Sequence, residues 1–259
     1  MKPEARSFAA FAPPALAPYL QHVWLGEPAH APGDNAMRIP LSALPDHRAA
    51  LLDAMTALYG GDAAHHARAL LSQWSKYYFG LAAPAGVAAA RLLGRPLDMS
   101  PERTHLVLMN GMPAELHFDA DALQPADADP ARRYAGLIAH LDSVIAMLSG
   151  MTKIAPRVLW SNAGNLLDYL LANCPLQCPT MSNDADIDAA WLFRASDANP
   201  LRTPLRDATP RSPLLPNPFR ARRVCCVRYE IPGETQLCAS CPLLLTMRDE
   251  ELALQDAIR

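Results

Sequence analysis

The chain has 259 residues, of which 51% are hydrophobic and 19% are charged. This composition can fill a sizeable core in one large domain or two small ones, which excludes a chain disordered along its whole length. The net charge is −3, and Lys2, Lys76 and Lys153 are the only lysines among 23 basic residues. No broad cationic surface is indicated, so nucleic acid is not an expected partner.

The amino-terminal stretch lacks the pattern of a membrane anchor or a secretory signal. Its longest uncharged run, 7–26, contains Pro13, Pro14 and Pro18, which would interrupt a spanning helix. Glu4 spoils the positive region that a signal peptide needs. We therefore expect a cytoplasmic protein.

The first sixty residues predict two short strands followed by a helix. The apolar runs 19–25 and 37–41 stand between Pro and Gly residues, as strands do. From Asp46 onward, apolar residues recur at spacings of three and four until Gly60 and Gly61. That periodicity predicts a helix with one buried face.

A wide apolar stripe marks the next helix, which begins after Asp62. The stripe must be buried against a neighbour, and its aromatic members are more typical of a core than of cofactor contacts. Pro84 is expected to end this helix, and a short Ala-rich helix is expected near 85–93. The stripe consists of Ala67, Leu70, Leu71, Trp74, Tyr77, Tyr78 and Leu81.

The strongest local signal outside the cysteines is a β-hairpin. Asn110-Gly111 stands between the apolar runs 105–109 and 112–118, a pattern typical of a tight turn. Pro113 has no amide hydrogen, so the second strand is expected to lie at a sheet edge or to start with a bulge.

Helices dominate the middle of the chain, and a Pro-rich segment follows them. Helical periodicity covers about 134–150, 158–171 and 184–194. Six prolines between 199 and 219 exclude a helix there and indicate an extended connector. The expected fold class is α+β and predominantly α-helical, with a helical domain that carries a β-hairpin and a small carboxy-terminal module.

Four cysteines within that module indicate a metal centre. The two-residue spacer between Cys238 and Cys241 aims two sulfurs at one metal atom in both zinc and iron–sulfur sites. Cys225 and Cys226 are adjacent and point to opposite faces of an extended chain, so they need a turn or a larger target. A 2Fe-2S cluster, with two irons and four Cys ligands, accommodates such a pair more easily than one zinc ion. Zinc, two disulfides and buried unliganded cysteines remain as alternatives.

Cys174 and Cys178 form a second, ambiguous pair. In a helix they would share a face and could chelate a metal. Packing in the core or in a loop is the simpler interpretation, because the cluster already has four ligands.

The cysteine segment resembles the carboxy-terminal signature of the FhuF-like ferric-siderophore reductases. The resemblance lies in residues 222–233 and 238–243, and residues 72–79 and 159–164 are similar to weaker motifs of the same family. The chain has eleven residues between its cysteine pairs where the family pattern has ten, with Leu237 as the apparent extra. Loop closure depends weakly on length, so the longer loop is expected to be tolerated.

The resemblance implies a domain order, a cofactor and an activity. Residues 1–198 would form a ferric-siderophore-reductase-like helical domain, 199–219 a connector, and 220–259 a 2Fe-2S-binding module. The cluster would pass one electron to Fe(III) in a hydroxamate-type siderophore and release Fe(II). A ferredoxin or a flavin reductase would be the external donor, because the sequence has no P-loop or dinucleotide-binding glycine fingerprint. Peripheral association with the inner membrane is compatible with this function.

The predicted site residues fall into two groups. Cys225, Cys226, Cys238 and Cys241 are the expected cluster ligands, and no further catalytic residue is needed. Candidate substrate or partner contacts are Arg222, Arg223, Arg228, Trp160 and Asn162. The arginines would raise the cluster potential or dock an acidic partner or anionic siderophore, and a solvated basic patch is the plain alternative.

Three rival functions remain open at this stage. A zinc-stabilised binding module would be colourless and redox-silent. An iron–sulfur electron carrier would cycle without preferring ferric chelates. A siderophore-biosynthesis ligase would need a nucleotide site, and nothing in the sequence resembles one.

Overall fold

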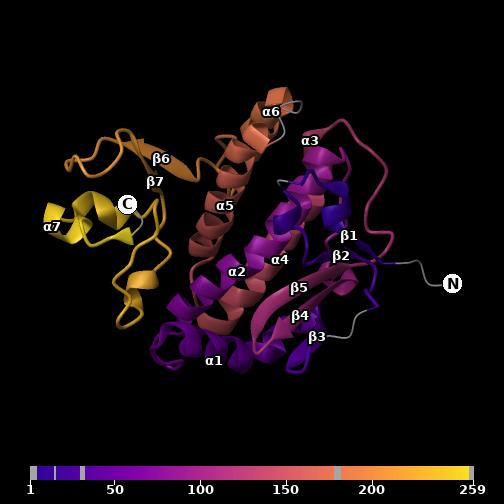
Figure 1. Ribbon diagram of the computed structural model, residues 1–259, viewed down its shortest axis with the longest axis horizontal. Helices are drawn as coiled ribbons and strands as arrows, with labels where there is room; N and C mark the ends of the chain where they lie inside the picture. The colour runs from indigo at the N-terminus through magenta and orange to yellow at the C-terminus, as the bar shows by residue number, and fades with distance from the viewer. Residues whose placement is uncertain (1–4, 15, 30–32, 178–181, 257–259) are drawn as a thin grey trace.

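A computed structural model describes residues 5–14, 16–29, 33–177 and 182–256. A mixed sheet lies against a group of long helices, and the carboxy-terminal segment lies on the far side of those helices from the sheet (Figure 1). This arrangement confirms the predicted α+β class with a large helical share.

Five strands form the main sheet in the order β1-β2-β5-β4-β3. The pair β2 and β5 is parallel, and the other neighbouring pairs are antiparallel. The two short strands predicted near the amino terminus are present as β2 and β3. The strands are β1 (Arg6–Ser7), β2 (Val23–Leu25), β3 (Ala36–Pro40), β4 (Thr104–Met109) and β5 (Met112–Phe118).

The predicted hairpin joins β4 to β5 through Asn110 and Gly111, both at positive φ (50° and 82°). A Cβ on Gly111 would lie 2.2 Å from the carbonyl oxygen of Ala50, so the turn also packs tightly on a helix. The register shifts between Val107 and Leu108, and Leu108 pairs with Pro113. The bulge expected from Pro113 is therefore confirmed. As a whole β5 is not an edge strand, because it lies between β2 and β4, but β2 pairs only with Leu116–Phe118 and does not reach Pro113.

Five of the predicted helices are present, and α2 (Ala67–Val87) is the central one. It packs against α1 (Arg48–Tyr59), α4 (Ala135–Thr152), α5 (Pro156–Gln177) and the strand β5. Shorter helices, α3 (Pro130–Arg133) and α6 (Ser182–Leu192), lie near the ends of α4 and α5. Within the described ranges, α4 is the one helix whose length and apolar composition would allow it to cross a bilayer.

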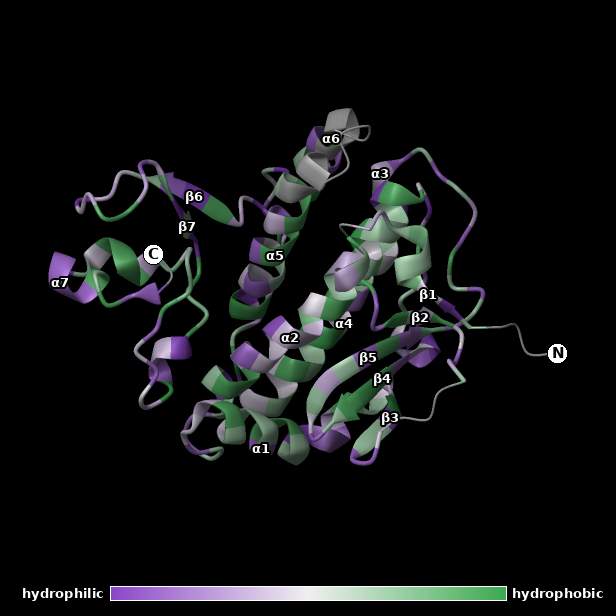
Figure 2. Cartoon of the chain, in the orientation of Figure 1, coloured by the Kyte–Doolittle hydropathy of each residue, from purple (hydrophilic) through white to green (hydrophobic). Residues whose placement is uncertain are grey.

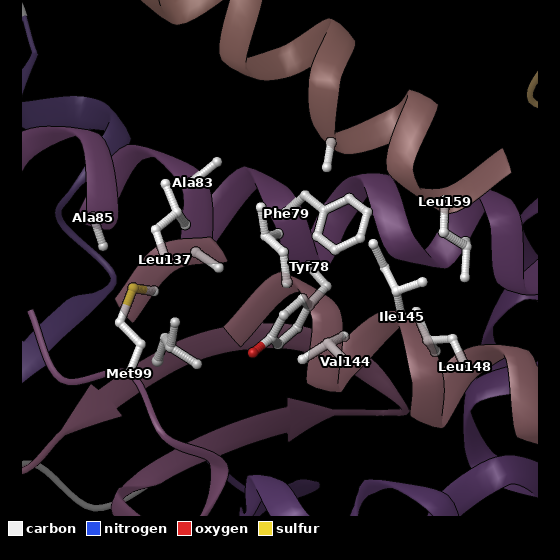
Figure 3. Close-up of a cluster of buried hydrophobic side chains, with 14 of the residues drawn as sticks. Tyr78, Phe79, Ala83, Ala85, Met99, Leu137, Val144, Ile145, Leu148 and Leu159 are labelled. Carbon is white, nitrogen blue, oxygen red and sulfur yellow. The ribbon is translucent and has the colours of Figure 1, made fainter. Parts of the chain in front are cut away.

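The main core lies between α2, α4 and α5. Figure 3 shows Tyr78 and Phe79 of α2 facing Val144 and Ile145 of α4, and these four side chains are almost fully buried. The helices approach closely at Gly86, where a Cβ would lie 2.8 Å from the side chain of Leu137. Figure 2 shows that hydrophobic residues are concentrated in these helices and in β4 and β5.

The prediction that Pro84 ends the second helix is wrong. The helix α2 continues to Val87 and passes into a π-helical segment, Ala88–Leu92, so the separate Ala-rich helix is its extension. A proline inside a helix removes one hydrogen bond and crowds the carbonyl group four residues earlier. Here that earlier residue is Gly80, and Pro84 itself is buried. We infer that core packing of this segment outweighs the local penalty.

Buried His140 on α4 gives a pH-dependent contribution to stability. Its Nδ1 donates to the carbonyl oxygen of Met99 (2.5 Å), so its Nε2 accepts from the hydroxyl of Tyr78 (2.7 Å). Burial lowers the pKa of His140 from 6.5 to about 4. The unfolded chain therefore binds a proton near pH 6.5, whereas the folded chain does so only near pH 4.

We expect this histidine to reduce stability as the pH falls from about 6.5 towards 4, by up to about 3 kcal/mol. In His140→Gln, the amide can keep both hydrogen bonds but cannot titrate. Urea unfolding of both proteins between pH 5 and 7 measures the effect. The wild-type protein should lose stability more steeply with falling pH, and parallel curves would contradict the assignment.

The carboxy-terminal region has its own small hydrophobic cluster, formed by Leu215, Phe219, Leu237, Leu244 and Leu252 among others. The Pro-rich segment 199–219 contains no helix, as predicted. It includes β6 (Leu205–Ala208), which pairs with β7 (Phe219–Arg222), so the connector is tied to the module that follows it. The division of the chain at 198 and 219 stays a prediction. A single turn of helix, α7 (Asp249–Leu252), lies near the end.

Candidate metal centre

All four predicted ligand cysteines lie together beside β7. Cys225 and Cys226 begin three residues after the end of that strand, and Cys238 and Cys241 lie on a turn closed by a hydrogen bond from the amide of Cys241 to the carbonyl of Cys238 (2.9 Å). None of the four is in a disulfide, which removes that alternative for this group. Cys226 and Cys241 are buried, and Cys225 and Cys238 are half-buried.

The four thiols contact one another in a closed ring. Cys225 interacts with Cys226 and Cys241, and Cys238 interacts with the same two residues. Among the residues that the structure describes, no three His, Cys, Asp or Glu side chains are arranged to hold a single metal ion. Four thiols in mutual contact supply the number of Cys ligands that a 2Fe-2S cluster takes.

Hydrogen-bond donors point at the sulfur atoms. The backbone amide of Val227 donates to Cys225, and that of Leu243 donates to Cys241. The ammonium group of Lys76 lies 3.2 Å from the Sγ atom of Cys226. Val227 has a positive φ of 54°, so the chain changes direction directly after the adjacent cysteine pair.

The surroundings of Cys226 favour its thiolate form. Hydrogen bonds from the thiols of Cys225 and Cys238, and then the positive charges of Lys76 and Arg222, hold the pKa of Cys226 far below its usual range. The pKa of Cys241 is raised, first because it shares a hydrogen bond with Cys225. Thiolates are the form of cysteine that binds metal, so the charged surroundings favour ligation at Cys226.

The residues present therefore fit a 2Fe-2S cluster. Four thiols lie within mutual contact, amides and one ammonium group donate to sulfur, and positive charge offsets the anionic cluster. The longer spacer is accommodated, because Leu237 packs in the small core and its amide donates to Gln255 (2.8 Å).

The helix α2 holds the first cysteine pair in place. The hydroxyl of Ser72 and the side-chain amide of Gln73 both donate to the carbonyl oxygen of Cys226, at 2.8 and 3.1 Å. Lys76 also donates to Gln73 (2.7 Å), so its ammonium group is fixed between that side chain and the sulfur of Cys226. One face of α2 thus positions both the backbone and the thiolate of this ligand.

Helix α5 holds the strand that leads to the cysteines. The guanidinium of Arg222 donates to Asn162 (2.5 Å) and Ser161 (3.2 Å), and all three are buried. The amide of Asn162 donates in turn to Ser72 and Ser75 on α2. Asn162 therefore connects α2, α5 and β7 at one point.

The five predicted contact residues have different surroundings. Arg222 and Asn162 are buried and bonded to each other, and Trp160 is mostly buried. Arg228 pairs with Glu234 (2.5 Å) and lies over the ring of Tyr59. Arg223 is exposed beside Cys225. Their roles in binding a substrate or partner stay predictions.

Sequence reasoning missed Lys76, Ser72 and Gln73 as groups that contact the cysteine segment. They lie in residues 72–79, which the sequence predicts as part of an apolar helix face and as a weak family motif, without assigning contacts to single side chains. The available signal was their spacing, because residues separated by three or four positions share a helix face. Lys76 is also one of only three lysines in the chain. The pair Cys174 and Cys178 lies outside the residues whose side chains are described.

Two separate cavities are each lined by one of the cysteines. One of about 520 Å³ is lined by Cys225 together with Arg68, Arg157 and Arg223. Another of about 250 Å³ is lined by Cys238 together with Lys76 and Tyr169. The two half-buried cysteines thus each face a separate cavity.

The fold and the ligand set define an iron–sulfur protein whose cluster module is held by two core helices. Comparison with known proteins agrees. Residues 222–243 match the family model described as the FhuF 2Fe-2S C-terminal domain. Residues 72–212 match the model described as the ferric iron reductase FhuF-like transporter.

The chain belongs to the FhuF-like ferric iron reductase family, as the resemblance predicted. It is 28% identical over 188 residues to the ferric siderophore reductase of Escherichia coli (strain K12). The matched region covers 67% of this chain and 65% of that relative, slightly less than two thirds of its length.

The ammonium of Lys76 should tune the cluster. A positive donor to a ligand sulfur stabilises the more negative, reduced state. We expect Lys76→Met to lower the midpoint potential by ~40 mV, which corresponds to about 1 kcal/mol for one electron. Lys153→Met is the matched control, because Lys153 is exposed at the end of α4. Redox titration followed by visible absorption measures both, and equal potentials would remove this role.

Proposed function

We propose that this protein is a ferric-siderophore reductase that uses a 2Fe-2S centre held by Cys225, Cys226, Cys238 and Cys241. The observation that carries the proposal is the ring of four free thiols, with donors aimed at the sulfurs, in a chain of this family. The relative from E. coli is named a ferric siderophore reductase, which supports the same activity.

Reduction is itself the step that releases iron. Anionic oxygen ligands hold hard Fe(III) tightly, and lowering the charge to Fe(II) weakens that grip. When bound, the 2Fe-2S cluster supplies one electron at a time. The residues around it position the ligands, offset their negative charge and leave Cys225 half-buried beside a cavity. No side chain needs to move a proton for this transfer.

The remaining parts of the proposal concern the substrate, the electron donor and the cellular location. We infer a hydroxamate-type siderophore as substrate and an external ferredoxin or flavin reductase as donor. The absence of a dinucleotide-binding glycine fingerprint in the sequence supports an external donor. A cytoplasmic location, with room for peripheral association at the inner membrane, fits a protein that receives imported ferric siderophores.

Anaerobically purified protein tests the proposal in two stages. Two irons and two acid-labile sulfides per chain, with visible absorption that dithionite bleaches, are expected. Stoichiometric zinc without sulfide would overturn the cofactor and the function together. The dithionite-reduced protein, freed of excess reductant, should then be reoxidised by a ferric trihydroxamate as a ferrous-specific chelator traps Fe(II). A cluster that cycles but is never reoxidised by any ferric chelate would leave only an electron carrier.

A further inference from the structure

We propose that a cationic groove beside Cys225 binds the ferric chelate and selects chelates of net negative charge. We call it the Arg157–Arg223 groove, after the two arginines that line both of its parts. The inference rests on the proposed reductase function and adds the place where the substrate binds and the charge that it carries.

The groove is formed by two adjoining cavities. The part beside Cys225 measures about 520 Å³, and the part beside Trp160 measures about 400 Å³. Arg157, Arg223 and Val224 line both parts, so one ligand can extend from one into the other. Sites for small molecules usually measure about 300–1,000 Å³, and each part lies in that range.

The second cavity at the cysteines is the less suitable one. It measures about 250 Å³ and lies beside Cys238, which is below the usual size of a ligand site. The positive groups that line it, Lys76 and Arg222, already donate to Cys226 and to Asn162. A bulky ferric chelate therefore fits the Cys225 side better.

The charges that line the groove leave an excess of two positive groups. Arg68 makes a two-pronged ion pair with Glu230, at 2.7 and 2.5 Å. Arg202 is paired with Asp197.

The guanidinium groups of Arg157 and Arg223 are different. They have no acidic partner among the residues that the structure describes, and both side chains are exposed to the groove and to solvent. These two positive charges remain available to a ligand, and guanidinium groups bind carboxylates in a two-pronged geometry.

The position of the groove suits electron transfer. Cys225 is the half-buried ligand in its wall, and the apolar side chains of Val158, Val224 and Val227 line the same part. These apolar groups can pack against the carbon chains of a chelate while the arginines hold its negative groups. The chelate's iron would then gain one electron from the reduced centre and leave as Fe(II).

The test uses three ferric chelates with one iron-binding group and different charges. Ferric desferrioxamine B carries one positive charge from its terminal amine. Its N-acetyl derivative is neutral, and its N-succinyl derivative carries one negative charge. Equilibrium dialysis against the oxidised holoprotein measures binding, and anaerobic mixing with the reduced holoprotein measures Fe(II) release.

We expect the succinyl derivative to bind about tenfold more tightly than the cationic chelate, with the neutral one between them. The preference should shrink as salt is raised, because exposed charges are screened. In the Arg157→Gln/Arg223→Gln variant, the three chelates should bind equally. Arg206→Gln/Arg211→Gln is the matched control, because it removes two exposed arginines outside the groove and should keep the preference.

The outcomes separate this inference from the proposed function. Equal binding of the three chelates by the wild-type protein, or an unchanged preference in the groove variant, would overturn the groove while Fe(II) release still supports a reductase. A different outcome is also informative. If the wild-type protein binds the chelates by charge, the groove variant loses this selectivity, and no chelate releases Fe(II), the reductase function is overturned and the anion-binding groove stands.

Discussion

Replacing Cys226 by alanine is expected to abolish the 2Fe-2S centre. This residue is buried, its sulfur lies 3.2 Å from the ammonium group of Lys76, and its carbonyl oxygen accepts hydrogen bonds from Ser72 and Gln73. One iron would lose a ligand at a buried position, where solvent cannot easily replace it. Iron and acid-labile sulfide should fall from two of each per chain to near zero, with loss of the visible absorption.

The control for this variant is Cys174→Ala, in one of the two cysteines outside the proposed ligand set. It should keep full iron, full sulfide and an unchanged spectrum. Retention of two irons in Cys226→Ala would show that another residue serves as ligand. Loss of the cluster in Cys174→Ala with an intact fold would show that the ligand set is assigned wrongly.

The second large effect is expected at Asn162. Leucine at this position leaves the buried guanidinium of Arg222 without its shortest hydrogen bond and removes the amide that donates to Ser72 and Ser75. Hydrogen bonds to buried charged groups are worth about 1.5–3 kcal/mol each. We expect the holoprotein to lose about 3 kcal/mol of stability against urea, measured by circular dichroism and by visible absorption.

A double variant identifies the cause of this loss. Arg222→Met/Asn162→Leu removes both partners, so it should recover part of the stability that Asn162→Leu loses. Asn165→Leu is the matched control on the same helix, because Asn165 accepts one neutral hydrogen bond from Ser240. It should cost about 1 kcal/mol. Additive losses in the double variant would contradict a direct coupling of Arg222 and Asn162.

Local patterns were enough to predict most elements of the fold. Asn110-Gly111 predicted the hairpin because its tight turn needs two adjacent residues at positive φ, and Asn and Gly tolerate that conformation best. The pairing of β2 with β5 was not predictable, since it joins Val23–Leu25 to residues more than ninety positions away. The predicted helix end at Pro84 was wrong because helix propensities describe an isolated helix. Here the proline is buried in a packed core, which outweighs its low propensity.

The parts of the site that depend on the spacing of residues along the chain were predictable. The four cysteines identify themselves, because few other uses explain an adjacent pair followed by a Cys-x-x-Cys group. Lys76 and Asn162 could not be given their partners from sequence, because each reaches a segment distant in the chain. Their roles depend on how α2 and α5 pack, and that packing is a property of the whole core.

The connection at Asn162 has a consequence for engineering relatives of this protein. Three stretches, at residues 72–76, 161–165 and 222–241, meet in one set of hydrogen bonds. The cysteine segment therefore depends on side chains of α2 and α5 and cannot be exchanged on its own. A chimera that grafts this segment from another family member should assemble its cluster only when the matching helix residues are transplanted with it.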